Sequence, residues 1–455
     1  MGLPAYKKWK NTKVQWPESI PEHWELKQLR YLFNFGRGLG ITKANLLDEG
    51  IPCINYGEIH SKFGFEVDPD RHELKCVDQA YLETGEKSLL EHGDFVFADT
   101  SEDIEGSGNF TYLNSELPTF AGYHTVVAKP ATNNDARFLA YLIDSQIFRF
   151  QIRKNVSGVK VYSITQDILK NCYAWLPIGD EQKKIVNFLD HKTKQIDQLI
   201  EKKKALIEKL DEQRIAVITQ AVTKGVDRKA KMKPSGVEWL GDIPEHWDVR
   251  RLRFCLNTNP VKSEVNQMES DTPVSFVPMN SVNEYGGMDA SATKPLEEVY
   301  SGYTYFIEND VVVAKITPCF ENGKGSLAKG LTNGIGFGTT EFHVLRSTEE
   351  IDADYIFFLT ISHAFRDIGA SEMLGAGGQK RIPEDFIKDF RLGIPNIEEQ
   401  RRIVEYINFQ LIKIDEMNNV SAQTISLYEE YRSALITSAV TGSIDVRNIK
   451  IPVSE

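Results

Sequence analysis

The feature that most constrains this chain is a long stretch, Asp180–Val222, that contains no proline and no glycine. Apolar residues recur in it at steps of three, four and seven, namely Ile185, Leu189, Ile196, Leu199, Leu206, Leu210, Val217 and Ala221. This spacing places them on one narrow face of a helix. Roughly 43 residues at about 1.5 Å each make a rod of about 65 Å. A rod of that length needs a partner that covers its apolar stripe.

The partner is expected in the same chain, because the sequence contains an internal repeat. Trp16–Arg30 reappears as Trp239–Arg253, and both copies include the pentapeptide Ile-Pro-Glu-His-Trp. Further segments match in the same order, namely 93–98 with 309–314, 135–142 with 352–359, 176–186 with 394–404, and 214–223 with 432–441. The chain therefore carries two copies of one plan, and each copy is a globule followed by a long helix.

The second long helix is predicted at Ile397–Ala439. Its stripe consists of Ile403, Ile407, Leu411, Ile414, Ile425, Tyr428, Tyr431, Leu435 and Ala439, and polar residues at 418, 419, 421 and 424 weaken its middle. Two equal units pair most simply about a two-fold axis. The two helices are therefore expected to pack against each other as an antiparallel coiled coil with internal pseudo-two-fold symmetry.

The fold class that follows is α+β, with two tandem mixed α/β domains, each followed by a long helix. The predicted boundaries are 1–178 for the first globule, 179–224 for the central helix, 225–395 for the second globule, 396–442 for the last helix and 443–455 for a tail. Short apolar runs bounded by turn residues predict strands. They are expected at Pro52–Tyr56, Phe95–Ala98 and Thr125–Ala128, with counterparts at Val274–Pro278, Val311–Ala314 and Phe342–Leu345.

Composition narrows the class of protein. The hydrophobic fraction of 41% is enough to build cores, and no apolar run approaches the length of a membrane span. The first residues, MGLPAYKKWKNTK, lack the apolar region of a signal peptide, and the five cysteines are scattered without a CxxC pair. These features favour a cytoplasmic protein without a metal site. The net charge of −12 counts against nucleic-acid binding unless a local basic face or a partner carries the phosphate contacts.

Motifs that would mark an enzyme are absent from the sequence. There is no GxxxxGK[ST] phosphate loop, no HExxH zinc motif and no calcium-binding loop. The tetrapeptide of amino-methyltransferases is also missing, because Val261 follows Asn259-Pro260. The two histidines of the repeated pentapeptide are better explained as polar corners packed on tryptophan. We therefore expect no catalytic residues and no cofactor on this chain.

Polar loops at matching positions in the two globules are the candidate binding residues. Two similar globules suit a ligand with two halves, and DNA half-sites one helical turn apart are such a ligand. Lysine and arginine hold phosphates, whereas Asn, Gln, Ser, Thr and Arg read base edges. Any one loop taken singly is more simply a solvated turn. The candidates are Arg37, Lys43, Asn55, Tyr56, Thr100, Ser101, Tyr123, His124, Lys160 and Tyr162, and then Asn280, Ser281, Lys315, Thr317, Asn322, Lys324, Thr339, Thr340, Gln379, Lys380 and Arg381.

With these motifs in place, the chain resembles the specificity subunits of type I restriction-modification systems. The resemblance rests on the duplicated segments Trp16–Trp24 and Trp239–Trp247, on the paired Glu-Gln-(Lys/Arg)-(Lys/Arg)-Ile-Val starts of the long helices, and on the matching ends Arg214–Thr223 and Arg432–Thr441. The segment 233–241 also resembles the family's approach to its second recognition domain. Together these motifs cover nearly the whole length of the chain.

The resemblance implies that the two globules are target-recognition domains, each reading one half of a split double-stranded DNA sequence. It also implies that the two ends of the chain meet. Two methyltransferase subunits that use S-adenosylmethionine to methylate adenine, and restriction subunits that use ATP and Mg, would be the partners. Two rival interpretations are a duplicated protein-interaction scaffold with no DNA specificity and a self-contained restriction or methylation enzyme, against which the missing motifs count.

Overall fold

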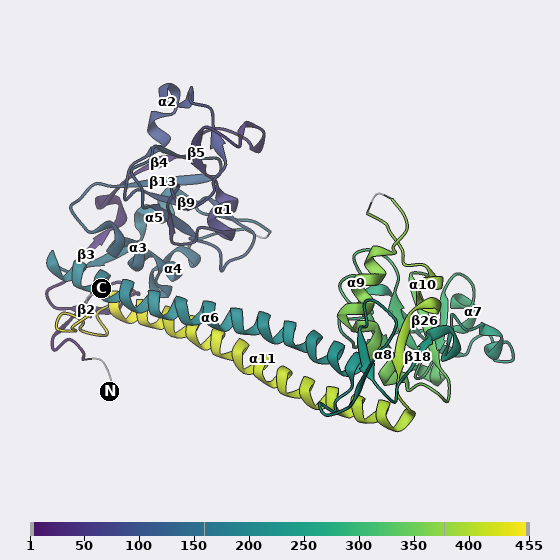
Figure 1. Cartoon of the computed structure of the whole chain (residues 1–455). Helices are drawn as coiled ribbons and strands as arrows, with labels where there is room; N and C mark the ends of the chain where they lie inside the picture. The colour runs from purple at the N-terminus through teal and green to yellow at the C-terminus, as the bar shows by residue number, and fades with distance from the viewer. Residues whose placement is uncertain (1–3, 159, 377, 452–455) are drawn as a thin grey trace. The chain divides into compact units, whose positions relative to one another are not determined.

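The computed structural model describes residues 4–158, 160–376 and 378–451, and it divides into two compact units. Unit 1 is formed by residues up to Lys202 together with those from Thr424 onward, and unit 2 is Lys203–Gln423. Two long helices, α6 at Asp180–Lys224 and α11 at Ile397–Val440, run through both units (Figure 1). Both predicted rods are thus confirmed: each begins where the apolar stretch was predicted to begin and ends slightly past Val222 or Ala439, within the predicted boundaries 179–224 and 396–442. The last residues of the predicted tail, 452–455, lie outside the described part of the chain.

The globule of unit 1 is built around a five-stranded and a four-stranded sheet. In spatial order the first consists of β4 (Phe33–Arg37), β13 (Thr125–Pro130), β9 (Phe95–Ala98), β11 (Phe110–Leu113) and β6 (Glu66–Val67). The second consists of β7 (Cys76–Val77), β5 (Ile51–Ile54), β12 (Thr119–Ala121) and β8 (Leu89–Leu90). Strands β9, β11 and β12 are entirely buried, so they form the centre of the core.

The globule of unit 2 repeats this plan with two four-stranded sheets. The first is β19 (Leu256–Thr258), β26 (Phe342–Ser347), β23 (Val311–Ala314) and β24 (Gly325–Leu327). The second is β21 (Thr293–Pro295), β20 (Pro273–Val277), β25 (Ile335–Gly338) and β22 (Thr304–Ile307). All six predicted strands are present, but the first ends at Ile54, because Asn55 and Tyr56 begin a helix instead.

Paired short helices cover each core. In unit 1 they are α3 (Ala136–Asp144) and α4 (Gln146–Arg153), and in unit 2 they are α8 (Ala353–Ile361) and α9 (His363–Ser371). Asp135 and Asp352 begin α3 and α8 as N-caps, since each side chain accepts hydrogen bonds from backbone N–H groups of the first turn. Smaller pairs complete the units: β1 (Trp9–Asn11) with β2 (Ser19–Pro21), β3 (Glu25–Gln28) with β15 (Tyr173–Leu176), β16 (Met232–Pro234) with β17 (Asp242–Pro244), and β18 (Asp248–Arg251) with β27 (Arg391–Ile394).

The two long helices pack antiparallel. In unit 2, Arg214 pairs with Asp415 and Asp211 accepts from Asn418, so residue numbers rise along one helix as they fall along the other. In unit 1, apolar residues of both helices share one buried cluster, including Ile185, Leu189, Ile196 and Ile200 of α6 and Leu435, Ile436 and Ala439 of α11. The prediction was wrong for Leu199 and Tyr431, which are 41% and 54% exposed. Ile200 is buried instead of Leu199, because adjacent helix positions point about 100° apart.

A buried glutamate explains why the repeated pentapeptide and the repeated helix start occur together. Glu181, in the first turn of α6, accepts a hydrogen bond from Trp24 Nε1 at 3.1 Å and from the phenol of Tyr6. Its second oxygen lies 2.8 Å from His23 Nε2. Burial and this bond raise the pKa of Tyr6. The carboxylate therefore joins the pentapeptide and the N-terminal arm to the helix.

The same contact is present in unit 2. Glu399 accepts from Trp247 Nε1 at 3.1 Å and lies 2.7 Å from His246 Nε2. The neighbouring glutamines, Gln182 and Gln400, each accept from the backbone N–H of the N-cap aspartate at 2.8 Å. The two histidines thus have a structural role, as predicted, but through a bond to the glutamate that also accepts from the tryptophan; their packing on tryptophan stays a prediction.

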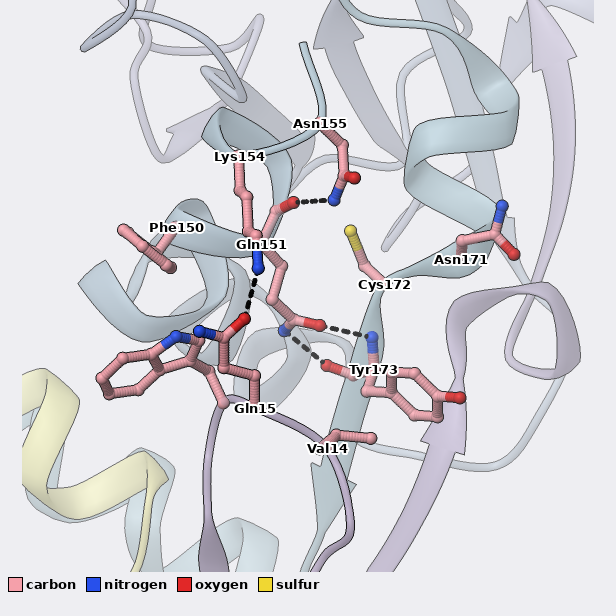
Figure 2. Close-up of a pocket in the computed structure, with 10 residues that line it drawn as sticks. Val14, Gln15, Phe150, Gln151, Lys154, Asn155, Asn171, Cys172 and Tyr173 are labelled. Carbon is pink, nitrogen blue, oxygen red and sulfur yellow. Dashed lines mark hydrogen bonds between the residues drawn. The ribbon is translucent and has the colours of Figure 1, made fainter.

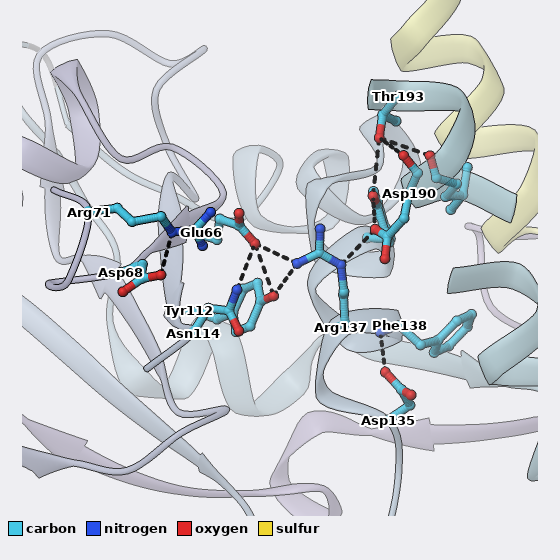
Figure 3. Close-up of polar contacts among 12 residues, drawn as sticks. Glu66, Asp68, Arg71, Tyr112, Asn114, Asp135, Arg137, Phe138, Asp190 and Thr193 are labelled. Carbon is cyan, nitrogen blue, oxygen red and sulfur yellow. Dashed lines mark hydrogen bonds and ion pairs between the residues drawn. The ribbon is translucent and has the colours of Figure 1, made fainter. Parts of the chain in front are cut away.

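In unit 1 a further set of hydrogen bonds joins the globule to α6 and is centred on Arg137 of α3 (Figure 3). Its Nε donates to Asp190 of α6 at 2.6 Å, while its Nη1 donates to Glu66 and Tyr112 of the sheet. Tyr141 donates to the same oxygen of Asp190 at 2.6 Å. The sheet and α6 are therefore connected through one half-buried guanidinium.

The two ends of the chain meet in unit 1. The backbone N–H of Asp445 donates to the carbonyl of Pro4 at 2.6 Å, and the Arg447 guanidinium lies 4.7 Å from the centre of the Tyr6 ring. The expectation that the termini meet is thus confirmed within this unit. The β1–β2 pair of unit 1 corresponds to the β16–β17 pair of unit 2, since Trp9 pairs with Pro21 as Met232 pairs with Pro244.

We predict that Glu181→Ala lowers the free energy of unfolding of unit 1 by about 2–4 kcal/mol, because each buried donor left without a partner costs about 1–3 kcal/mol. Glu399→Ala should cost unit 2 less, since among the described residues that carboxylate accepts no hydrogen bond from a tyrosine. Calorimetric unfolding of both variants measures the difference. Glu208→Ala, an exposed position on α6, is the matched control and should be near neutral. Equal losses for Glu181→Ala and Glu208→Ala would contradict the assignment.

Candidate nucleic-acid interface

Loops that follow or precede the central strands converge in unit 1. Tyr56 opens the short helix α1 (Tyr56–Ser61), and its ring lies edge-on to Tyr123 at 5.7 Å and to His124 at 5.4 Å between centroids. His124 Nδ1 lies 3.2 Å from a carboxylate oxygen of Asp99. Strand β10 (Thr100–Ser101) pairs with β14 (Tyr162–Ser163), so Ser101 lies opposite Tyr162. Six predicted residues, namely Tyr56, Thr100, Ser101, Tyr123, His124 and Tyr162, are therefore brought together.

A cavity of about 660 Å³ opens among these loops and is lined by Tyr56, Thr100 and Ser101 together with an acidic rim at 102–105. His60 also lines it, with Nε2 2.8 Å from the carbonyl of Thr100 and Nδ1 2.9 Å from the Asn109 amide nitrogen. The amide must donate, so His60 Nδ1 accepts and Nε2 carries the proton. Sequence reasoning missed His60 and Asn109, since neither forms a local motif and only the fold brings them together.

The equivalent loops also converge in unit 2. The backbone N–H of Lys315 donates to the carbonyl of Glu341 at 2.8 Å, and that of Thr317 donates to the carbonyl of Lys380 at 3.0 Å. Arg381 donates from Nε and from Nη2 to the two oxygens of Glu341, each at 2.9 Å. The arginine lowers the pKa of Glu341, so this carboxyl stays ionised. Lys315, Thr317, Lys380 and Arg381, with Thr339 and Thr340 just before Glu341, form one cluster.

Matching backbone bonds show which positions of the two clusters correspond. Ile164 donates to the carbonyl of Asp99 at 2.8 Å, as Ile382 donates to that of Lys315 at 2.8 Å. The strand pairing Thr125 with Ala98 is matched by Phe342 with Ala314. It follows that Asp99 corresponds to Lys315, His124 to Glu341 and Ser163 to Arg381. The backbone plan is the same, but these positions differ in charge.

The remaining predicted residues lie apart from these bonds. Arg37 ends β4, Lys43 lies in a 3-10 turn and Lys160 is exposed, and their side chains form no hydrogen bond or ion pair within the described residues. Asn55 is 3% exposed and serves as the N-cap of α1. Asn280 and Ser281 lie in a 3-10 turn, Asn322 donates to Glu284 at 3.1 Å, and Lys324 donates to the carbonyl of Met279 at 3.4 Å. Base contact by any of these residues stays a prediction.

A second cavity, of about 550 Å³, lies beside the cluster of unit 2 and was not predicted. Tyr300, Tyr303 and Tyr305 line it together with Lys262 and Lys315. The Lys262 ammonium is 4.5 Å from the centre of the Tyr300 ring. The lining thus combines aromatic rings and two lysines with one carboxylate, Glu384, whereas the charged residues that line the unit 1 cavity at 102–105 are all acidic.

The cores beneath the two clusters differ at a buried arginine. In unit 1, Arg149 donates to Asn109 at 2.6 Å and to Asp144 at 3.0 Å. Its counterpart Arg366 donates to the carbonyl of Phe320 at 2.7 Å, but its Nε and Nη2 have no partner within the described residues. Burial lowers the pKa of Arg366 to about 9. The divergence between the units therefore extends below the loops.

A smaller cavity of about 310 Å³ in unit 1 lies away from the cluster, between the N-terminal arm and α4 (Figure 2). The side chain of Gln151 bonds both the N–H and the carbonyl of Tyr173, at 2.9 and 3.0 Å, and Lys154 donates to Gln15. Its principal polar groups are therefore already engaged. Among all the described residues, no group of three His, Cys, Asp or Glu side chains could hold a metal ion. No helix in this part of the chain is long and apolar enough to cross a membrane.

This chain is similar in sequence to one protein family and to several known proteins. The family described as "Type I restriction modification DNA specificity domain" matches residues 21–209 and 244–425. The chain is 34% identical over 224 residues to the Escherichia coli type I restriction enzyme EcoEI specificity subunit, which covers 48% of this chain and 37% of the relative. It is 31% identical over 234 residues to the Escherichia coli EcoAI specificity subunit, with 50% and 39% covered. The chain thus spans less than half the length of these relatives.

Solved structures share the fold. One comes from a study of complex assembly and conformational transition of the type I restriction-modification system, with a TM-score of 0.66 at 14% identity, covering 94% of this chain and 100% of that chain. Another is the HsdS subunit from Thermoanaerobacter tengcongensis, with a TM-score of 0.52 at 14% identity and 94% and 99% covered. At this identity the likeness concerns the fold alone.

We predict that Gly122→Ala disrupts the unit 1 cluster. An added Cβ would lie 2.9 Å from Cys53 Sγ and inside van der Waals contact of the Asn55 amide, which caps α1. Overpacking of this kind typically costs about 1–3 kcal/mol. Urea unfolding measures the loss, and Gly40→Ala, with open space around its added Cβ, is the control. If both variants were equally stable, the close packing behind Tyr56 would be disproved.

Proposed function

We propose that this chain, which belongs to the family of type I restriction modification DNA specificity domains, is a DNA-sequence recognition subunit that reads a two-part, asymmetric target. The observation that carries the proposal is the duplicated loop cluster. The same backbone bonds hold Asp99 in unit 1 and Lys315 in unit 2, but the side chains on these frames differ in charge. A duplicated frame with different side chains suits two half-sites of different sequence.

The chemistry of the clusters supports DNA as the ligand. Arginine, lysine, glutamine and threonine side chains, such as Arg381, Gln379 and Thr339, offer donors and acceptors for base edges in the major groove. The net charge of −12 opposes attraction of the whole chain to phosphates. We therefore propose that partner subunits supply most of the phosphate contacts, and that the chain alone binds DNA weakly.

Chemistry on the DNA is assigned to partners in this proposal. Two methyltransferase subunits would hold S-adenosylmethionine and methylate adenine, and restriction subunits would use ATP and Mg. The sequence of this chain contains neither a phosphate loop nor a methyltransferase tetrapeptide, which agrees with that division of labour. The names of the related proteins, restriction enzyme specificity subunits, support the same division.

The outer face of α11 supports docking of a methyltransferase subunit. Within unit 2 this helix exposes Tyr406, Phe409, Met417 and Val420, which are 37%, 56%, 48% and 59% exposed. Their spacing of three and eight residues places them on one face, beside the face that packs on α6. Exposed apolar faces of this kind mark protein interaction sites. A methyltransferase subunit is the occupant that we propose.

The proposal is tested by sequencing methylated DNA from cells that express this chain together with its methyltransferase partner. The expected result is one bipartite motif carrying methylated adenine, which disappears when this chain is omitted. Exchanging the globule of either unit for that of another family member should change one half of the motif only. A methylome without a motif that depends on this chain would favour the rival interpretation of a protein-interaction scaffold.

We predict that Phe409→Glu abolishes co-purification of the methyltransferase subunit, because it places a charge at the centre of the exposed stripe. Helix content and thermal stability should be nearly unchanged, since the side chain is exposed and a glutamate at 409 can pair with Lys413, whose ammonium lies 3.9 Å from the centre of the Phe409 ring. Asn419→Glu, at an exposed position on another face of α11, is the matched control and should leave the complex intact. Affinity is measured by isothermal titration with purified subunits. Retention of the complex by the Phe409 variant would rule out this face.

A further inference from the structure

We infer that Arg381 reads a guanine in the half-site bound by unit 2, and that Glu341 is its positioning residue; this rests on the proposed function. A guanidinium has five N–H groups. Glu341 accepts one from Nε and one from Nη2, both at 2.9 Å. The other edge of the guanidinium, formed by Nη1 and Nη2, has outward N–H groups that Glu341 does not bind. Nη1 makes one long contact, 3.5 Å, with the carbonyl of Gln379. Two parallel donors are therefore presented together.

The backbone that carries this arginine is held from two sides. Arg381 exchanges N–H···O bonds with Leu374 at 2.8 and 2.9 Å, and the next residue, Ile382, donates to Lys315 at 2.8 Å. Lys315 follows the fully buried strand β23. The side chain is 44% exposed, while the Glu341 side chain is 25% exposed. The guanidinium is thus fixed on a rigid frame and remains accessible.

The geometry selects guanine among the bases. In the major groove guanine presents two neighbouring acceptors, O6 and N7, which match two parallel N–H donors. Adenine replaces one acceptor with an amino donor, cytosine offers an amino donor, and thymine offers one acceptor beside a methyl group. Each of the other bases would leave at least one donor of Arg381 without a partner.

Pairing with Glu341 also distinguishes base reading from phosphate binding. The ion pair has no net charge, so its long-range attraction to the DNA backbone is small compared with that of a free cation such as the neighbouring Lys380, whose side chain forms no ion pair within the described residues. A guanidinium that is held in place and neutralised in this way suits the two acceptors of a base edge better than a phosphate. In unit 1 the corresponding positions hold Ser163 and His124, so that unit has no such fork.

The test compares methylation motifs of cells expressing the methyltransferase partner with wild-type chain, Arg381→Gln, Arg381→Lys or Glu341→Gln. We expect Arg381→Gln to reduce discrimination at a single guanine position by about 10- to 100-fold, with every other position retained. Arg381→Lys, which keeps the charge but loses the fork, should relax the same position. Glu341→Gln should relax it less, since the arginine remains. The half-site read by unit 1 should not change.

Arg253→Gln is the matched control, because Arg253 is also an exposed arginine paired with a carboxylate, Asp389, at 2.7 Å, but lies outside the loop cluster. Its motif should equal that of wild type. Thermal unfolding of the purified complexes shows whether each variant folds, and Arg381→Lys carries the test if Arg381→Gln does not fold.

Three results would overturn the inference. One is an unchanged motif for a folded Arg381 variant, and another is relaxation at a base pair other than G·C. The third is a uniform loss of binding to all duplexes together with a salt dependence lowered by about one ion, which indicates a phosphate contact. A wild-type complex that marks no bipartite motif would instead defeat the proposed function itself, so the two failures are distinguishable.

Discussion

The buried carboxylates of Glu181 and Glu399 are the contacts on which both repeats depend. Each joins the tryptophan and histidine of the repeated pentapeptide to the first turn of a long helix, with an indole bond of 3.1 Å in both units. Trp24 and Trp247 are fully buried, so their N–H groups need an acceptor inside the core. The same carboxylates therefore orient the globule strands relative to the helix that follows them. Because each contact spans over 150 residues, it closes each repeat into one structure.

The second constraint is that the two units share one backbone arrangement but carry different side chains in their loops. Strands β9 and β23 are completely buried, and identical backbone bonds follow them, so the chain leaves the core at the same place in each unit. The side chains at these exits are free to differ because they are not needed for the core. Asp99 with His124 in unit 1 and Glu341 with Arg381 in unit 2 both bring a carboxylate against a nitrogen of a basic side chain, but with different members. The fold thus holds its variable residues in place without depending on their identity.

Prediction from sequence succeeded where the signal was periodic or repeated. The rods, the central strands and the structural role of the histidines depend on spacing or on duplicated motifs, and all are present in the structure. It was less reliable at single positions. Leu199 and Tyr431 fit an apolar heptad yet lie outside the seam, since neighbouring turns and the globules decide which side of a helix is covered. Asn55 looked like a free polar side chain but caps a helix, which depends on a backbone conformation that the sequence does not specify.

By itself the sequence determined the duplicated architecture, the two long helices and the family to which the chain belongs, because amphipathic period and repeated motifs are local properties of the chain. Only the tertiary structure decided which polar residues lie together. His60 meets Asn109, and Arg381 meets Glu341, across separations of 49 and 40 residues. Such contacts depend on how strands are ordered in the sheets, and no local pattern records that order. The charges that distinguish the two clusters therefore became visible only once the strands were paired.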